Sequence, residues 1–334
     1  MSASEGSRPV SQTPADLTDH QIQEDFSDFA LFNSYGLDLY LIPGNRFDLV
    51  ANAVGILREL TYRQQLSGSG QSHDLDSRDQ FYDHFLLVER LTGELAGSAR
   101  LQFVPKKEIG RQIPANWTPQ SGQSYLEHVY PGIKTTLTQQ GHHLEIGRVA
   151  LAPRFQRLPH PLMCLFRGGI QVAISSGYYS IGGLVSYNHF AYDDRVNKQF
   201  LSSLISPPFS DTDQTPPQPR HPLRGVEQLK ESKRLTTIQA LEQQIKKELD
   251  PNFKLPILLR QYINLIGARV VNLSLALDFN KITEILMSAD LSKMPTERLQ
   301  HFTGLEHQPV YKQFSWYRGL DAKPSAVRIE REVY

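Results

Sequence analysis

The sequence has a single cysteine, Cys164, among 334 residues. One cysteine excludes an intramolecular disulfide framework and any zinc site built on two or more cysteines. A single cysteine is also compatible with a protein of the reducing cytosol. Because Cys164 stands among apolar neighbours in an expected helix, we expect it in the core.

Long apolar runs and a leader pattern are also lacking. No apolar stretch approaches the ~18 residues that a membrane-spanning helix needs. The first thirty residues are polar and acidic, with no basic segment before an apolar one, which is unlike a standard secretory signal. We therefore expect a cytoplasmic protein, either soluble or peripheral at the inner face of the membrane.

A net charge is lacking as well, since 35 Lys and Arg balance 35 Asp and Glu. A zero balance argues against a dedicated nucleic-acid binder, which usually has a basic excess. The charges are unevenly placed, however. Residues 1–40 contain seven acids and one Arg, whereas residues 146–192 contain four Arg and no acid. We expect a local positive field in the middle of the chain.

Well-known catalytic signatures are absent too: there is no nucleophile elbow, P-loop, dinucleotide fingerprint or zinc-protease motif. His189 and Asp194 fit the H-x₄-D pattern of glycerophospholipid acyltransferases, in which the His is a base oriented by the Asp. The phosphate-binding block of those enzymes is missing, so we expect this match to be accidental.

The apolar periodicity predicts a mixed α/β (α+β) order. Strands are expected at 37–42, 84–90, 95–104, 144–152, 179–187, 268–277 and 282–289, and helices at 45–63, 162–176, 226–249 and 257–266. The order is not the regular alternation of a TIM barrel. It predicts one mixed central sheet flanked by helices.

Three segments stand apart from this sheet. Residues 1–30 are expected to be a disordered acidic tail, with ordered structure starting near Leu37. Residues 206–250 form an expected insertion, because 206–222 contain six prolines and the charged helix that follows resembles a solvated surface helix. We expect one domain over 31–305 and a C-terminal extension over 306–334. Most of 106–141 is expected to be loop.

Charged residues interrupt the apolar elements and are costly to bury unless paired. They are Arg63, Asp76, Asp79, Arg100, Glu145 and Arg148. They are expected to form an ion-pair network, a site, or both. Glu145 and Arg148 are three residues apart, so a regular strand would point them to opposite faces, whereas a bulge would bring them together.

Four blocks of sequence stand in a fixed order around these charges. They are Leu60-Thr-Tyr-Arg63; Asp76-x-x-Asp79-x-x-x-Asp83-His84-Phe-Leu-Leu-Val88 with Gly97-x-x-Arg100; Glu145-Ile-Gly-Arg148-Val-Ala-Leu-Ala-Pro153; and Leu255-Pro-Ile-Leu-Leu-Arg260-Gln-Tyr262 with Gly267-Ala268 and Asp278-Phe279-Asn280. Together they resemble the hemolysin-like N-acyltransferases of the GNAT superfamily, which include ornithine acyl-[acyl-carrier-protein] N-acyltransferase. Acyl-homoserine-lactone synthases share the first three charge patterns but lack the fourth block.

The sequence departs from this family at several points. Gln261 replaces a usual Gly, Lys281 replaces a Thr, and the acid expected soon afterwards is at best shifted to Glu284. The GNAT pyrophosphate signature is missing after Ala152. There, Arg154-Phe-Gln-Arg157 keeps only its charge, which favours an acyl-carrier-protein donor over coenzyme A.

The resemblance implies a GNAT-like acyltransferase fold and transfer of a long-chain acyl group to the α-amine of an amino acid. The donor would be an acyl-carrier-protein or coenzyme A thioester, and the product an N-acyl amino acid or a lyso-aminolipid. No metal or further cofactor is expected. The expected partners are the acyl carrier protein and the amino acid, with the Lys-bearing helix of the insertion as a candidate contact to an anionic membrane and no nucleic acid.

The resemblance also assigns roles to residues. The catalytic pair is Glu145, as the base, with Arg148; the substrate-binding set is Arg63, Asp76, Asp79 and Arg100; and the donor-binding set is Val149 and Leu151, through their backbone N–H groups, with Arg154 and Arg157, joined by Arg167. Arg100 and Arg148 could hold the substrate carboxylate or order Asp76 and Asp79. The alternatives are an acyl-homoserine-lactone synthase and a non-catalytic acyl-carrier or lipid-binding module.

Overall fold

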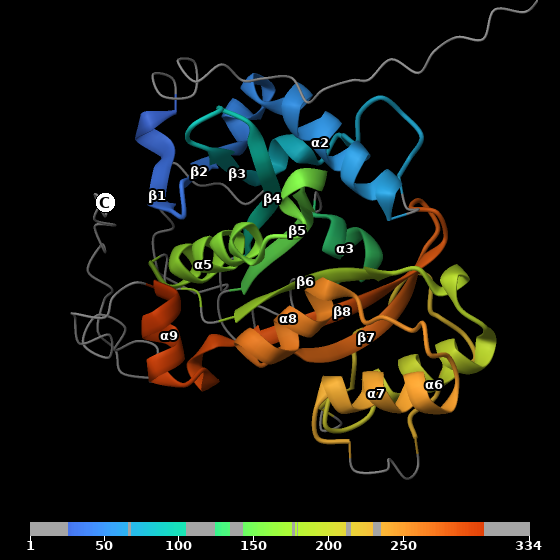
Figure 1. Cartoon of the computed structure of the whole chain (residues 1–334). Helices are drawn as coiled ribbons and strands as arrows, with labels where there is room; N and C mark the ends of the chain where they lie inside the picture. Colours follow the sequence, from blue (N-terminus) through green and yellow to red (C-terminus); the bar gives the residue numbers. More distant parts are fainter. Residues whose placement is uncertain are drawn as a thin grey trace, which may run out of the picture.

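The computed structural model of the chain describes residues 26–65, 68–104, 124–133, 143–175, 178, 180–211, 215–229 and 235–303. The strands form an eight-stranded sheet in the order β1-β2-β3-β4-β5-β6-β8-β7 (Figure 1). They are β1 (Ala30–Ser34), β2 (Leu37–Ile42), β3 (Asp83–Glu89), β4 (Leu95–Val104), β5 (His143–Leu151), β6 (Ser180–Tyr187), β7 (Arg269–Ala276) and β8 (Ile282–Asp290). Neighbouring strands are antiparallel, except that β5 and β6 are parallel.

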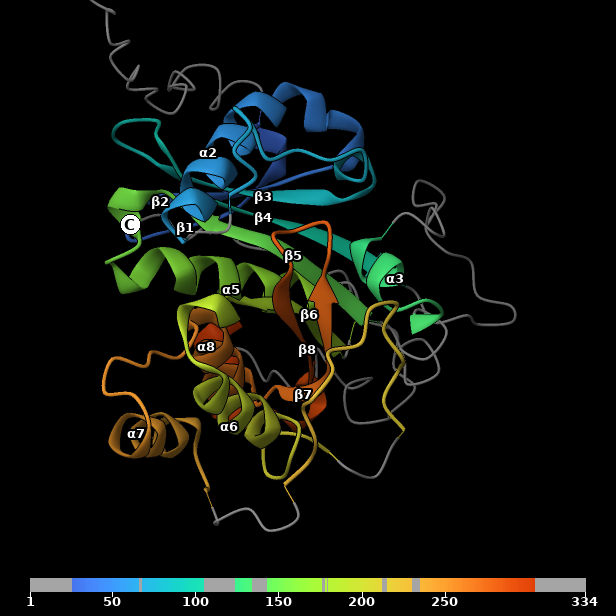
Figure 2. The same cartoon turned by 90° about the vertical axis from the view of Figure 1, so that its right-hand side faces the viewer.

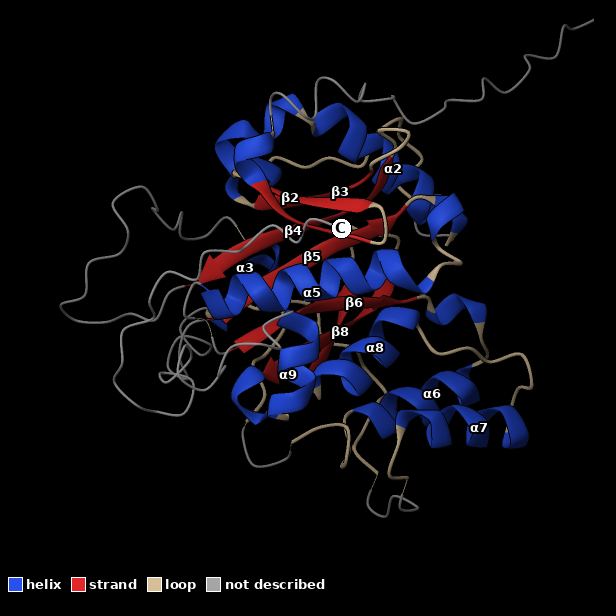
Figure 3. Ribbon diagram, turned by 60° about the vertical axis from the view of Figure 1, so that its left-hand side comes forward, coloured by secondary structure: helices blue, strands red, loops and turns tan. Residues whose placement is uncertain are grey.

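Helices cover both faces of this sheet. They are α2 (Ala51–Gln64), α3 (Tyr125–Val129), α5 (Pro159–Ser175), α6 (Asp194–Leu204), α7 (Ile238–Glu248), α8 (Ile257–Ile266) and α9 (Thr296–Thr303). Figure 2 shows α2 on one side of β3, β4 and β5 and α5 on the other. Figure 3 shows α5 running across β5 and β6. Within the described residues, no helix combines the length and the apolar character needed to cross a bilayer.

The expected mixed α/β sheet flanked by helices is confirmed. The hairpin around Gly93, the strand that ends before Pro153, and the final strand pair all form where the sequence predicts them. Helix α8 ends at Gly267, whose φ of 66° is the left-handed conformation that favours glycine at a helix end. Cys164 lies in α5 and is buried, as expected.

Two expected boundaries are wrong. Ordered structure does not begin near Leu37, because β1 pairs with β2 from Ala30 onward. The helix expected over 226–249 extends only over α7, because residues 226–229 are not helical and Thr237 caps the helix at the N–H of Ala240. Helices α3, α6 and α9 have no counterpart in the expected order.

The segment 206–250 packs into the same core as the rest of the chain. Phe209, Ile238, Leu241 and Ile245 all belong to the main hydrophobic core. Helix α7 therefore has a buried face and is not solvated all round as expected; it lies beside α6 (Figures 1 and 3). The expected division of the chain stays a prediction, since residues 1–25 and 304–334 lie outside the described residues.

The strands β5 and β6 part from one another. Their ladder covers the pairs His143–Ser180, Leu144–Ile181 and Glu145–Gly182, although β5 continues to Leu151 and β6 to Tyr187. Gly183 lies at the start of this gap, where a Cβ atom would stand 2.0 Å from the carbonyl oxygen of Ile146. Glycine is required there because the two backbones approach closely.

Replacing Gly183 with alanine tests this close approach. The new methyl would meet a backbone oxygen that cannot turn away, so we expect Gly183→Ala to lower the free energy of unfolding by about 3 kcal/mol, the upper end of overpacking costs. Gly147→Ala on the facing strand is the control, because its nearest contact is 3.9 Å away, and it should change stability by less than about 1 kcal/mol. Equal losses in urea unfolding would contradict this explanation.

Candidate active site

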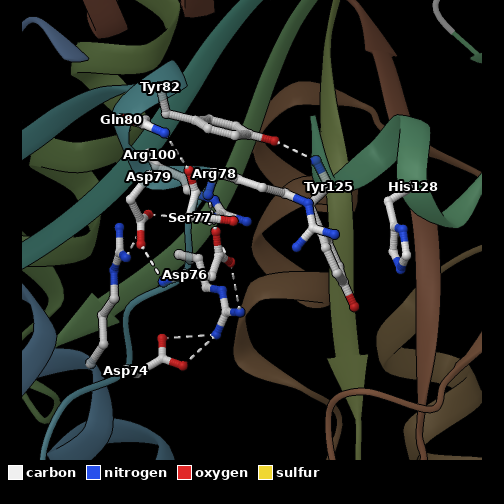
Figure 4. Close-up of polar contacts among 12 residues, drawn as sticks. Asp74, Asp76, Ser77, Arg78, Asp79, Gln80, Tyr82, Arg100, Tyr125 and His128 are labelled. Carbon is white, nitrogen blue, oxygen red and sulfur yellow. Dashed lines mark hydrogen bonds and ion pairs between the residues drawn. The ribbon is translucent and has the colours of Figure 1, made fainter. Parts of the chain in front are cut away.

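A buried network of arginines and aspartates lies where α2, β4 and the residues before β3 meet. The Asp79 carboxylate accepts hydrogen bonds from Arg58 of α2 at 2.9 Å and from Arg100 of β4 at 3.0 Å. Arg100 also binds Asp76 at 3.1 Å. Figure 4 shows Asp74, Asp76, Asp79 and Arg100 gathered at this place. The structure therefore brings together three of the four predicted substrate-binding residues.

Burial makes this pairing necessary. The side chains of Arg58, Asp79 and Arg100 are at most 3% exposed. Burial alone would raise the pKa of Asp79, but Arg58 and Arg100 outweigh it and hold that pKa well below its ordinary value. Burial, followed by the charge of Arg58, lowers the pKa of His84 to about 3. His84 is thus neutral at pH 7, accepting from Arg58 at 3.3 Å and donating to the Asp79 carbonyl at 2.8 Å.

Arg148 joins the same network through a bulge in β5. The β4–β5 register places Ser98 opposite Ala150 and Arg100 opposite Gly147, so β5 has one extra residue. Arg148 sits at this point with a φ of 50°, a conformation that costs a non-glycine residue about 1–2 kcal/mol. Its guanidinium binds both oxygens of Asp74, at 2.7 and 2.8 Å, and reaches Asp76 at 3.4 Å. Of the two options left open above, the bulge is confirmed.

Glu145 lies beside this network and is 4% exposed. Its Oε1 accepts a hydrogen bond from the Tyr82 hydroxyl at 2.7 Å and from the Leu126 N–H at 3.3 Å. The Tyr82 hydroxyl in turn accepts from the Tyr125 N–H at 2.7 Å, and the Arg100 guanidinium lies 4.4 Å from the Tyr82 ring centre. Glu145 therefore fixes the beginning of α3 against the sheet.

The edge of β5 that faces the gap presents peptide groups. The Ala152 N–H donates to the Ala96 carbonyl on β4. Because peptide groups alternate in direction along an antiparallel strand, the N–H groups of Leu151 and Val149 point the other way, toward β6. The Leu151 carbonyl on that side accepts from Thr61 at 2.9 Å and Gln156 at 3.0 Å. Both N–H groups are thus directed away from β4, and the role of Val149 and Leu151 in donor binding stays a prediction.

A second buried carboxylate, Glu284 of β8, lies on the other side of the gap and is 3% exposed. Its Oε1 accepts from the Tyr125 hydroxyl at 2.9 Å, and that hydroxyl is also 3.2 Å from Asp278. Burial raises the pKa of Glu284 to about 7. Tyr125 therefore connects the carboxylates Glu284 and Asp278 to Tyr82, which lies beside the Arg–Asp network.

The remaining predicted residues lie apart from this network. Arg63 is half exposed and binds Glu59 at 2.8 Å and the Gln71 carbonyl at 2.7 Å. Arg154 forms ion pairs with Glu89 and Glu94, both at 2.7 Å.

A surface depression of about 500 Å³ follows the C-terminal end of β5, and it is lined by Gln64, Pro153, Arg154, Gln156 and Arg157. Arg167 does not line it, since its guanidinium lies 4.6 Å from the Phe32 ring centre. Of the arginines predicted to bind the donor, Arg154 and Arg157 thus line one depression, and their role stays a prediction.

The H-x₄-D match has no catalytic geometry. His189 Nδ1 lies 2.9 Å from the Thr283 hydroxyl, and Asp194 is an exposed residue in the first turn of α6. Among the described residues, no group of His, Cys, Asp and Glu side chains has the arrangement of a metal site.

Sequence reasoning missed Arg58, Asp74, Tyr82 and Tyr125. The signal for Arg58 was present, because it stands on the apolar face of α2 beside Val54 and Leu57, where an arginine needs a buried partner. Tyr82 sits inside the second motif block. Asp74 and Tyr125 enter the site only through tertiary contacts.

Residues 57–165 match a family model described as an acetyltransferase (GNAT) domain. That stretch contains the Arg–Asp network, the bulge and the edge of β5. This part of the chain is an acyltransferase domain of the GNAT kind. A comparison with curated protein sequences gives no match.

Several solved structures of low sequence identity are similar to this chain. FeeM, an N-acyl amino acid synthase from uncultured soil microbes, is 11% identical with a TM-score of 0.39, over 80% of this chain and 96% of its own. BjaI, a CoA-dependent acyl-homoserine lactone synthase, is 10% identical with a TM-score of 0.40, over 82% and 91%. The loading GNATL domain of CurA from Lyngbya majuscula is 14% identical with a TM-score of 0.34, over 77% and 99%.

Replacing Asp79, the central carboxylate of the network, tests how much the network contributes to the stability of the protein. Asp79→Asn leaves two buried guanidinium groups short of a partner, so we expect a loss of about 3–5 kcal/mol in the free energy of unfolding at pH 7. Because the folded-state pKa is lowered, this contribution is complete above the ordinary aspartate pKa and is lost as the pH falls below it.

Asp38→Asn is the matched control for this variant. Asp38 pairs with the half-exposed Arg90, and its loss should cost no more than about 1 kcal/mol. Both variants are measured by urea unfolding at pH 7. Equal costs would show that the buried network contributes no more than a surface ion pair.

Proposed function

We propose that this protein is an N-acyltransferase that moves a long-chain acyl group from an acyl-carrier-protein thioester to the α-amine of an amino acid. The product is an N-acyl amino acid or a lyso-aminolipid. The observation that carries the proposal is the parting of β5 from β6, with the buried carboxylates Glu145 and Glu284 on its two sides.

The reaction follows from that arrangement. The amino acid enters as an ammonium, which is no nucleophile until a carboxylate takes one proton from it. The nitrogen then attacks the thioester carbon, the C–N bond forms, and the C–S bond breaks. The second proton goes to the departing thiol, so that an amide, a free thiol and one proton leave. The N–H groups of Val149 and Leu151 stabilise the negative charge that develops on the thioester oxygen.

The arginines that follow the C-terminal end of β5 are suited to bind the phosphate of the acyl donor. The depression lined by Arg154 and Arg157 follows directly on the strand edge that holds the thioester. A phosphopantetheine phosphate bound to Arg157 therefore places its thioester arm along the gap. Arg154, which is held by Glu89 and Glu94, keeps the β3–β4 hairpin beside this entry.

Arg100 and Arg148 have separate tasks in this proposal. Arg100 is buried, and its Nη1 donates to both Asp76 and Asp79, so it orders the site. The Arg148 side chain is 19% exposed. It is therefore the arginine that can still reach the carboxylate of an amino acid.

A product assay tests the function. The protein is incubated with long-chain acyl thioesters of acyl carrier protein or of coenzyme A, together with a pool of amino acids, and the products are identified by mass. We expect an N-acyl amino acid, formed faster from the carrier thioester.

The controls separate the alternatives. A product that requires S-adenosylmethionine and carries a lactone would favour an acyl-homoserine-lactone synthase. Tight carrier binding without any amide, whichever amine is supplied, would favour a non-catalytic binding module.

A further inference from the structure

The Tyr125 hydroxyl faces two carboxylates at once. It lies 2.9 Å from Glu284 Oε1 and 3.2 Å from Asp278 Oδ1. A phenol has one hydrogen and satisfies one of these oxygens at a time. The second oxygen of Glu284 has only a long contact with the Ser274 hydroxyl, at 3.4 Å. This pair of carboxylates therefore has acceptor capacity that the single Tyr125 hydrogen does not fill, and a group rich in N–H donors, such as an ammonium, is suited to it.

Glu284 lies at the open end of the gap. Glu145 pairs with Gly182 in the β5–β6 ladder, and four residues further along the two strands lie Val149 and Ser186. Ser186 pairs with Glu284 in the β6–β8 ladder. Glu284 is thus level with Val149, to within the one residue that the bulge adds. Glu145 lies at the closed end of the gap, where the strands are still paired.

Glu145 and Glu284 lie on the same face of the sheet, because both reach the first turn of α3, through Leu126 and Tyr125. Glu145 Oε1 accepts from two donors that fix this turn, the Tyr82 hydroxyl and the Leu126 N–H. Its buried Oε2 has no hydrogen-bond partner among the described residues, so what distinguishes Glu145 from Glu284 is the turn that its Oε1 holds. A glutamine in its place retains an oxygen that can accept both bonds. Glu145 is therefore suited to hold α3 in place.

The charges around Glu284 favour an exchangeable proton near neutral pH. Burial, with a smaller contribution from the charge of Asp278, raises the pKa of its carboxyl to about 7, against the opposing effects of Tyr125, Ser274 and Arg148. Beyond these, His128 lies 3.8 Å from Asp278. A carboxylate with a pKa near 7 is suited to accept a proton from an amine at the working pH.

We propose that Glu284, held by Tyr125, binds the amine of the acceptor and takes its proton, and that Glu145 is a positioning residue that fixes the start of α3. This inference rests on the proposed function, since it names the base of that reaction. The proton moves from the bound ammonium to Glu284 before the nitrogen attacks, and it leaves for solvent once the amide has formed.

Two isosteric variants test the assignment through the pH dependence of kcat at saturating substrates. Wild type should show an ascending limb that levels off at about pH 7. Glu284→Gln should lower kcat by about 100-fold and abolish this limb. Glu145→Gln should keep the limb and at least a tenth of kcat. The exposed Glu297→Gln on α9 is the control and should match wild type.

Persistence of the limb in Glu284→Gln, or its loss in Glu145→Gln alone, would overturn the proposal while leaving the acyl transfer intact. Absence of any amide from wild type would instead remove the proposed function together with this inference. The two failures are thus distinguishable.

A readout independent of activity is the thermal midpoint. Because the folded-state pKa is raised, the stability that Glu284 contributes is present below the ordinary glutamate pKa and is lost as the pH rises through about 7. Relative to wild type, Glu284→Gln should therefore gain in Tm between pH 5 and pH 8.5. A pH-independent difference would contradict the proton-accepting role.

Discussion

The parting of β5 from β6 is the constraint on which the rest of the molecule depends. Two parallel strands in the middle of a sheet normally continue to pair, yet here the ladder covers three residue pairs and the strands then separate. Gly183 permits the close approach just before they part. The separation turns a strand edge, which would otherwise be buried in a ladder, into a row of peptide groups that face a gap.

The buried charges on α2, β4 and β5 hold together the part of the molecule on the β5 side of this gap. Asp79 is a single buried carboxylate shared by an arginine from α2 and an arginine from β4. Its removal from water is compensated by those two guanidinium groups. The bulge turns Arg148 into the same network, so a strained backbone conformation is held by two further aspartates. Glu284 lies on the other side of the gap, on β8, which pairs with β6. Tyr125 of α3 connects the two sides through its hydrogen bond to Glu284.

The elements that the sequence predicts well are those whose apolar residues repeat with a clear period. Strands β2 to β6 and the pair β7–β8 have this property. Strand β1 is short and follows an acidic tail, so its Ala30–Ser34 segment carries little periodicity. The predicted start of α7 was wrong because charged residues continue upstream of Thr237. The helix begins only after Thr237, whose side chain caps its N-terminus.

The site was predictable as a set of residues but not as an arrangement. The motif blocks name Asp76, Asp79, Arg100 and Arg148, and burial of charge explains why they meet. Arg63 was chosen from the end of α2, whereas Arg58, one turn earlier and on the inward face, is the residue that reaches Asp79. The contact between Tyr125 and Glu284 joins residues 159 positions apart, and no local pattern indicates it.

In the proposed reaction the acyl group passes from thioester to amine where β5 and β6 part. A crystal structure of the protein with a bound N-acyl amino acid is the decisive test. We expect the amide oxygen within hydrogen-bonding distance of the Val149 or Leu151 N–H, with the amide nitrogen directed toward Glu284. An amide bound outside the gap, with β5 and β6 unchanged around an empty space, would contradict the proposed reaction.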